Sequence, residues 1–218
     1  MRLVLLPGLG ADARMFEGMR AVVGEIEVPG WIEPERGESL ASYGARMAGG
    51  LAAGETPVLG GVSMGGMLAL EMARHIRVRG LVLISTATDV SSVSRLRWLE
   101  RLSRALPGGA LIRLASSRVS VRQMAGRLDE ATRRVYVTMV RETAPSLLRW
   151  GMRAVLSWPG ADAEAVPVLR VHGDEDRLFP VPVGAEVVRG AGHLCVMTHA
   201  ERVGELVQAW APESPAGA

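Results

Sequence analysis

Short apolar runs bounded by turn residues recur along the chain and predict buried β-strands. They lie at Leu3–Leu6, Val58–Leu59, Leu81–Ile84 and Val168–Val171. Apolar runs that do not alternate with polar residues are typical of parallel strands that are covered on both faces. Parallel strands require crossover connections, so helices are expected between these runs.

Helical periodicity does appear between the predicted strands. In the clearest case the apolar residues Leu40, Tyr43, Met47 and Leu51 recur at spacings of three and four. Ser39 precedes them and is suited to capping a helix N-terminus. The alternation of strands and helices predicts the α/β class, with a doubly wound, mostly parallel sheet of about six strands.

The last predicted helix carries signals at both of its ends. Thr198 and Glu201 have the spacing of a capping box, and Pro212 would stop the helix. The apolar face between them comprises Val203, Leu206, Val207 and Trp210. The pattern predicts a helix that ends close to the C-terminus.

Residues 86–165 show helical periodicity only. No strand signal interrupts this stretch, which therefore predicts a helical cap inserted into a single domain that spans residues 1–218. Its large side chains are candidate walls of an acyl-binding pocket, although most such side chains belong to the ordinary core of a protein. The candidates are Trp98, Tyr136, Met139, Trp150 and Trp158.

Composition narrows the classes of function. A chain of 218 residues with 48% apolar residues is long enough for one domain with a sizeable core. The net charge is only +2, although all 25 basic residues are arginine, and no aromatic-rich basic strip accompanies them, so no nucleic-acid partner is expected. The single cysteine, Cys195, allows no internal disulfide, and no Cys/His cluster predicts a metal site.

The apolar runs also bear on location. None reaches the roughly 20 residues that span a bilayer, and the first is too short for a signal peptide. We therefore expect a cytoplasmic protein without a membrane span. The sequence does not indicate its oligomeric state.

One strand–turn–helix segment has the pattern of a nucleophile elbow. Residues 58–67 read Val-Leu-Gly-Gly-Val-Ser-Met-Gly-Gly-Met, which predicts a strand, a sharp turn at Ser63 and a helix from Gly65 to about His75. A serine on such a turn is presented at the carboxyl edge of the sheet, and small neighbours such as Gly61 let the two backbones pass closely. Ser63 is therefore the candidate nucleophile.

With this segment the chain resembles the α/β-hydrolase superfamily, and three further motifs in the expected order extend the resemblance over nearly the whole chain. Leu6-Pro7-Gly8-Leu9-Gly10 follows the first strand and is similar to the loop that supplies an oxyanion-hole donor. The resemblance implies that the backbone N–H groups of Leu9 and Met64 form the oxyanion hole. Many relatives carry His at the position of Pro7, so this loop departs from their pattern.

The acid and the base follow in the C-terminal part of the chain. Residues 171–180 read Val-His-Gly-Asp-Glu-Asp-Arg-Leu-Phe-Pro and look like the acid loop of the superfamily, which places the orienting carboxylate at Asp176 with Asp174 as its rival. His193 follows Gly190-Ala191-Gly192, where relatives carry the general base. The remaining histidines, His75, His172 and His199, are expected to be packing or surface residues.

The spacing of acid and base is unusually short. Only 17 positions separate Asp176 from His193, so the helix that relatives usually have between them is missing here. The residues at 181–184 can still connect the two strands, because four extended residues span roughly 13 Å and neighbouring strands lie about 5 Å apart. A small variant of the fold is therefore expected.

Together these residues predict a serine hydrolase. His193 would take the Ser63 proton, Asp176 would fix the imidazole tautomer, and an acyl-enzyme would form and be hydrolysed without a cofactor or a metal. Carboxylic esters of small acyl groups, thioesters included, are the expected substrates. The same residues could serve an acyltransferase, a perhydrolase or a carbon–carbon hydrolase, and a non-catalytic ligand-binding protein is the alternative outside enzymes.

Overall fold

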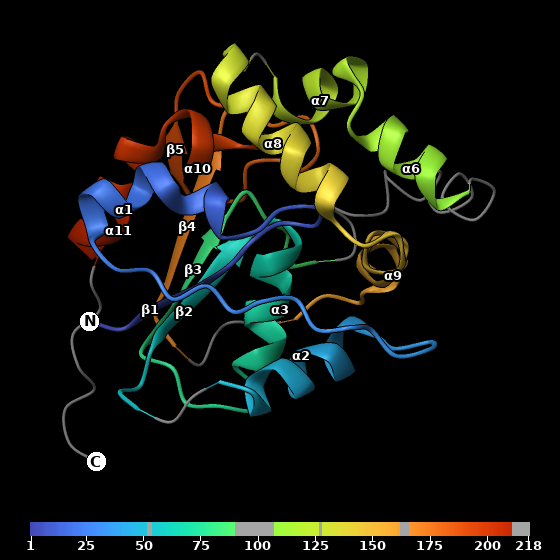
Figure 1. The fold of residues 1–218 in the computed structure, drawn as a ribbon. Helices are drawn as coiled ribbons and strands as arrows, with labels where there is room; N and C mark the ends of the chain where they lie inside the picture. Colours follow the sequence, from blue (N-terminus) through green and yellow to red (C-terminus); the bar gives the residue numbers. More distant parts are fainter. Residues whose placement is uncertain (52–53, 90–106, 127, 162–165, 211–218) are drawn as a thin grey trace.

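Five parallel strands form the centre of the molecule (Figure 1). The structure is a computed structural model that describes residues 1–51, 54–89, 107–126, 128–161 and 166–210. The strands are β1 (Leu3–Leu6), β2 (Val58–Val62), β3 (Gly80–Ile84), β4 (Val168–Gly173) and β5 (Glu186–Val188), and their order in space is their order in the chain. Every neighbouring pair is parallel, and β1, β2 and β3 are buried along their whole length. The α/β class and the parallel sheet are thereby confirmed.

A sixth strand is reduced to a single bridge. Glu27 lies parallel to β1, donates its N–H to Leu3 O at 2.9 Å and accepts the N–H of Leu5 at 3.0 Å. The next N–H that would continue this ladder belongs to position 29, and Pro29 has none. The described part of the sheet therefore has five strands and this bridge.

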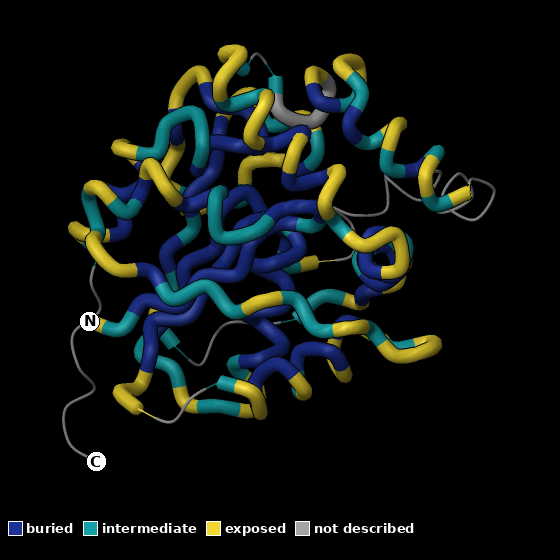
Figure 2. Tube along the Cα trace, in the orientation of Figure 1, coloured by how far each residue is buried: buried dark blue, intermediate teal, exposed yellow. Residues whose placement is uncertain are grey.

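Helices cover both faces of the sheet (Figures 1 and 2). On one face lie the 3-10 helix η1 (Ala13–Phe16) and the helices α1 (Glu17–Val23), α10 (Cys195–Thr198) and α11 (Ala200–Trp210). On the other face α2 (Leu40–Gly49) packs on α3 (Met64–Met72). One apolar cluster is buried on each side, as a doubly wound sheet requires.

The two helices with predicted caps differ in outcome. α2 begins as expected, because the Ser39 hydroxyl accepts the N–H of Ser42 at 3.1 Å and Ser42 reciprocates. The predicted capping box of the last helix is wrong. Thr198 is the last residue of the preceding helix α10, and its hydroxyl lies 3.3 Å from Leu194 O and 2.9 Å from His199 Nδ1.

Four described helices connect β3 to β4, and we call them the inserted helices. They are α6 (Gly108–Ala115), α7 (Arg118–Ala125), α8 (Glu130–Glu142) and α9 (Pro145–Ser157). α8 packs against η1, α9 packs against α2, and α6 and α7 lie at the upper right of Figure 1, further from the sheet. Within the described ranges, no helix is both long enough and apolar enough to cross a bilayer.

Candidate active site

Ser63 occupies a strained turn between β2 and α3. Its backbone has φ 55° and ψ −121°, a region that residues with a side chain rarely adopt. The predicted role of the neighbouring glycines is confirmed. A Cβ on Gly61 would lie 2.5 Å from the Gly65 carbonyl carbon, and one on Gly65 would lie 2.2 Å from Leu6 O. Only glycine fits at either place, so the chain can present Ser63 at the carboxyl edge of the sheet.

Neighbouring strands and the following helix hold this turn. The Ser63 N–H donates to Ile84 O at 3.0 Å, and the hydroxyl of Thr86 donates to Ser63 O at 2.6 Å. α3 begins at Met64, so the Met64 N–H is one of the first-turn donors that have no partner within the helix. The partial positive charge at the N-terminus of α3 therefore lies beside Ser63.

The predicted oxyanion loop runs alongside this turn. A Cβ placed on Gly8 would lie 3.6 Å from Ser63 Cβ, so the loop passes the serine in van der Waals contact. The Leu9 and Met64 side chains meet at α9, because a Cβ on Gly151 would lie 2.5 Å from Leu9 Cδ1 and 3.0 Å from Met64 Sδ. The inserted helices therefore cover both residues that the resemblance assigns to the oxyanion hole.

The structure brings Asp176 and His193 together. His193 Nδ1 lies 2.8 Å from Asp176 Oδ2, and both side chains are buried. Asp174 lies elsewhere, since its Oδ1 accepts the N–H of Gly190 at 2.7 Å and so ties the acid loop to the loop before His193. A Cβ on Gly173 would lie 2.2 Å from Ala191 O, which shows how closely these two loops run.

Four nitrogen atoms surround the Asp176 carboxylate. Oδ1 accepts the N–H groups of Leu178 at 2.8 Å and Phe179 at 3.1 Å. Oδ2 faces His193 Nδ1 and also His172 Nε2, which lies 3.1 Å away. Burial alone would raise the pKa of Asp176, but the hydrogen bonds from His172 and His193 outweigh it and hold that pKa well below its usual range. Asp176 is therefore a carboxylate at neutral pH.

The geometry around His193 leaves one ring nitrogen available. With Nδ1 engaged by Asp176, Nε2 carries the lone pair in the neutral ring. The edge of the ring packs on Phe179, with the ring centroids 5.4 Å apart. Between the described residues Ser63 and His193 no hydrogen bond is present, and nucleophile–base contacts are often long when no substrate is bound.

Two contacts of this site escaped the sequence analysis. His172, expected to be a packing or surface residue, is 1% exposed and contacts the acid. Thr86 braces the carbonyl of the nucleophile. The signal for Thr86 was its place two residues after β3, because parallel neighbours end at the same edge of the sheet and Ile84 is in register with Val62.

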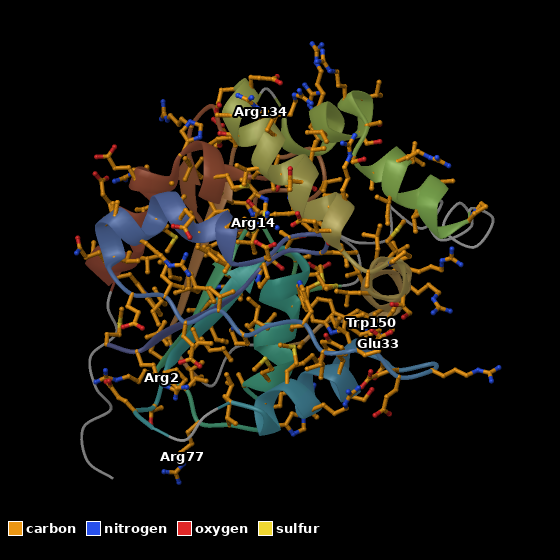
Figure 3. The ribbon with its side chains drawn as sticks, viewed as in Figure 1. Arg2, Arg14, Glu33, Arg77, Arg134 and Trp150 are labelled. Carbon is orange, nitrogen blue, oxygen red and sulfur yellow. The ribbon has the colours of Figure 1, made fainter. Side chains whose placement is uncertain are left out.

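The predicted pocket residues occupy different environments. Met139 in α8 lies beside the oxyanion loop, since its Sδ is 3.5 Å from the Asp12 nitrogen. Trp150 in α9 faces α2 instead, where its ring lies 4.2 Å from that of Tyr43 and its Nε1 donates to Glu38 O at 2.9 Å (Figure 3). These contacts give Trp150 a packing role between α9 and α2.

The remaining aromatic candidates are buried or lie outside the described part of the chain. Burial raises the pKa of Tyr136 to about 12. Trp158 is 2% exposed and donates to Glu71 Oε1 at 2.7 Å. Trp98 falls outside the described residues. Cys195 is also buried, with its Sγ 3.3 Å from the Ser85 hydroxyl, and burial raises its pKa to about 11.

A cavity of about 290 Å³ lies on the acid side of the site. Its lining includes Thr86, Asp89, Arg170, His172 and Val183 but not Ser63. The connection between β4 and β5 contributes Pro180, Val181, Pro182 and Val183 to this lining. The cavity is thus adjacent to the acid rather than to the nucleophile.

Comparison with known proteins agrees with this architecture. A model of the alpha/beta hydrolase family matches residues 3–206. The chain belongs to the α/β-hydrolase family. No curated protein matches this α/β-hydrolase.

Solved structures extend the comparison to the fold. A thermophilic esterase from Thermogutta terrifontis has a TM-score of 0.72 at 20% identity, covering 96% of this chain and 89% of that one. A lipase-esterase related protein from Clostridium acetobutylicum has a TM-score of 0.71 at 15% identity over 96% and 93% of the two chains. An enol-lactonase from Burkholderia xenovorans has a TM-score of 0.68 at 17% identity over 96% and 91%. These structures share the fold, and together with the family they support a hydrolase activity.

Proposed function

We propose that this α/β-hydrolase cleaves carboxylic esters, thioesters included, of small acyl substrates through a covalent acyl-enzyme. In this proposal Ser63 is the nucleophile, His193 the general base and Asp176 the residue that orients the base. The observation that carries it is the buried pair of His193 Nδ1 and Asp176 Oδ2, 2.8 Å apart, at the sheet edge that also presents Ser63. Such a pair fixes the tautomer that leaves Nε2 free to accept a proton.

The reaction follows from these positions. His193 Nε2 takes the proton from Ser63 Oγ as Oγ bonds to the carbonyl carbon, and the carbonyl electron pair moves to oxygen. The resulting oxyanion accepts hydrogen bonds from the N–H groups of Leu9 and Met64. When the tetrahedral intermediate collapses, the alcohol or thiol leaves with the proton from His193. Water then attacks the acyl group with His193 again as base, which releases the acid and restores Ser63.

The surroundings of the loop favour an uncharged acyl group. Leu9 and Met64 contact α9, and a Cβ on Gly10 would lie 3.4 Å from Val140 and 3.9 Å from Leu148. These side chains are apolar, so a charged acyl group would lose its hydration without gaining a partner. Solved structures with this fold include an esterase and an enol-lactonase, and these names agree with the proposed hydrolysis of esters.

The proposal also covers organisation and location. We infer a single domain over residues 1–218 in which residues 86–165, the inserted helices among them, cap the site, with Tyr136 and Met139 on its cap side. Support comes from α8 and α9, which lie over the oxyanion loop. A cytoplasmic location is proposed because the single cysteine is a free, buried thiol.

The test combines labelling with turnover. A fluorophosphonate should label the folded wild type and fail to label the heat-unfolded protein or Ser63→Ala. On a panel of esters with increasing acyl length, Ser63→Ala should lose on the order of 10⁵–10⁶-fold in kcat, whereas Ser157→Ala, an exposed serine in α9, should keep wild-type rates. Turnover above a few per cent in Ser63→Ala would rule out the proposal, and labelling without turnover of any ester would favour a ligand-binding role.

A further inference from the structure

Two buried histidines share one oxygen of the acid. His193 Nδ1 lies 2.8 Å and His172 Nε2 lies 3.1 Å from Asp176 Oδ2. His172 is the second-last residue of β4, and its side chain and that of Asp176 are buried, with exposed fractions of 1% and 0%. The catalytic scheme above uses His193 and leaves His172 without a role.

The neighbours of His172 Nε2 determine where its hydrogen lies. Besides Asp176 Oδ2, the nitrogen faces the carbonyl oxygen of Phe179 at 3.2 Å. A carboxylate and a carbonyl only accept hydrogen bonds, so Nε2 must carry a hydrogen for either contact to be favourable. Whatever the charge of the ring, Nε2 therefore carries a hydrogen, which the Phe179 carbonyl accepts and which Asp176 Oδ2 also faces at 3.1 Å.

We propose that His172 is a positioning residue, which holds the Asp176 carboxylate in place and limits how strongly it attracts the His193 imidazolium. The inference rests on the proposed function, because it assigns His172 a role through the acid and base of that mechanism. His172 approaches Asp176 from β4, whereas His193 approaches from the loop after β5. The carboxylate is thus clamped between two elements rather than attached to the base alone.

Loss of the His172 donor should affect both position and charge. Oδ2 would keep one hydrogen bond, so the carboxylate could turn about the Oδ1 contacts and lose its alignment with His193. The uncompensated negative charge would also stabilise the protonated form of His193, which cannot act as a base. Both effects lower turnover, and the second moves the acid limb of the pH–rate profile to higher pH.

Among the residues that the structure describes, three other titratable or charged groups lie near this cluster. The Cys195 thiol from α10 is electrostatically coupled to Asp176, and burial keeps it neutral at neutral pH. Asp89, after β3, and Arg170, in β4, line the same cavity as His172. A change in the acid limb on substitution of His172 therefore reports mainly on the shared Asp176 oxygen.

Three substitutions of His172 distinguish the effect of its Nε2–H group from the effect of the shape of its ring. His172→Leu removes the donor, His172→Gln places an amide N–H close to the position of Nε2, and His172→Asn is too short to reach Asp176. The control is His75→Gln, an exposed histidine beyond α3. We expect His172→Leu and His172→Asn to lose about tenfold in kcat with KM little changed, and to move the acid limb of kcat/KM upward by about 0.5–1 pH unit. His172→Gln should recover most of both losses.

A purely structural role would give a different result. Folded His172→Leu with the acid limb and kcat of the wild type would overturn the inference. If His172→Leu does not fold, equal acid limbs in His172→Gln and His172→Asn would overturn it in the same way.

A second readout does not depend on activity. Histidine ¹⁵N–¹H correlation spectra of the wild type, assigned by loss of a signal in His172→Gln, should show hydrogen on Nε2 of His172. Hydrogen on Nδ1 only would refute the contact even in an active enzyme. By contrast, absence of any Ser63-dependent turnover would refute the proposed function and leave this spectrum as the test of the contact.

Discussion

The two halves of the candidate site are held by different forces. Asp176 is held by three hydrogen bonds, from the N–H groups of Leu178 and Phe179 and from His193, and by the close approach of His172 from β4. The oxyanion loop is held by close apolar contact, with Leu9 and Met64 packed on Gly151 of α9. The acid half is thus complete within the sheet edge, whereas the other half depends on the inserted helices.

This contrast predicts that the acid–base pair and the acyl preference depend on different parts of the molecule. Hydrogen bonds to a buried carboxylate are directional, so they fix the acid and base regardless of what covers the site. Van der Waals contacts to a helix transmit any shift of that helix to the loop. Changes in the inserted helices should therefore alter oxyanion stabilisation and acyl preference while leaving the acid–base pair unchanged.

The largest effect is expected at the acid. Asp176→Asn replaces an oxygen that only accepts by an amide group that must turn an N–H toward a donor, and a comparable change in the serine proteases costs about 10⁴-fold in turnover. Asp174→Asn keeps an oxygen for the Gly190 N–H and should stay within a few-fold of wild type. Turnover of one activated ester, with folding checked by circular dichroism, decides between them, and greater damage in Asp174→Asn would show that the acid has been misassigned.

A smaller loss is expected at the oxyanion loop. Leu9→Pro removes the backbone donor and should cost about 10²–10³-fold in kcat, whereas Leu9→Ala keeps the N–H and should mostly spare it. The acid limb of the pH–rate profile should be the same in both variants. Equal losses in the two variants would mean that Leu9 contributes through packing alone.

The coupling between α9 and this loop predicts a milder change. Gly151→Ala would bring a methyl group within 2.5 Å of Leu9 Cδ1, so the Leu9 side chain must shift. We expect kcat to fall by about 3–10-fold and acyl-length preference to change. Gly109→Ala in α6, where a Cβ meets nothing within 4 Å, is the matched control. If both variants behave alike, α9 does not control the oxyanion loop.

The smallest expected effect concerns stability in acid. Burial opposes the shift, but the hydrogen bonds from His172 and His193 keep the folded-state pKa of Asp176 below its unfolded value of about 4. Asp176 therefore contributes stability that is present above about pH 4 and is lost as the pH falls through the folded-state pKa. Urea unfolding should show the stability gap between wild type and Asp176→Asn narrowing from about pH 6 to about pH 3. A constant gap would contradict the lowered pKa.

The sequence predicted local features better than contacts between distant segments. The start of α2 at Ser39 and the close passage of Gly61 and Gly65 follow from residue types within one turn, and the structure confirms both. Parallel strands buried on both faces were predictable from apolar runs. About six strands were expected, and the missing N–H of Pro29 explains why the described sheet has five strands and only a bridge at Glu27.

What escaped prediction depends on tertiary placement. His172 contacts Asp176 only because the acid loop folds back over the end of β4, and residue types do not specify that path. Trp150 was a candidate pocket residue because its side chain is large and apolar. The course of α9 instead places its ring against Tyr43. The capping pattern at Thr198 was misleading because a separate helical turn, α10, already uses that residue.

The order of the strands also bears on how the chain assembles during synthesis. Because order in space equals order in the chain, each strand can join the edge of the preceding one as it leaves the ribosome. The long insertion between β3 and β4 delays this growth but hinders it little, since each doubling of a loop costs only about 0.6 kcal/mol. Asp176 and His193 both follow the insertion. A nascent chain thus forms the turn that bears Ser63 before it contains Asp176 and His193, so under the proposed mechanism an incomplete chain would lack its general base.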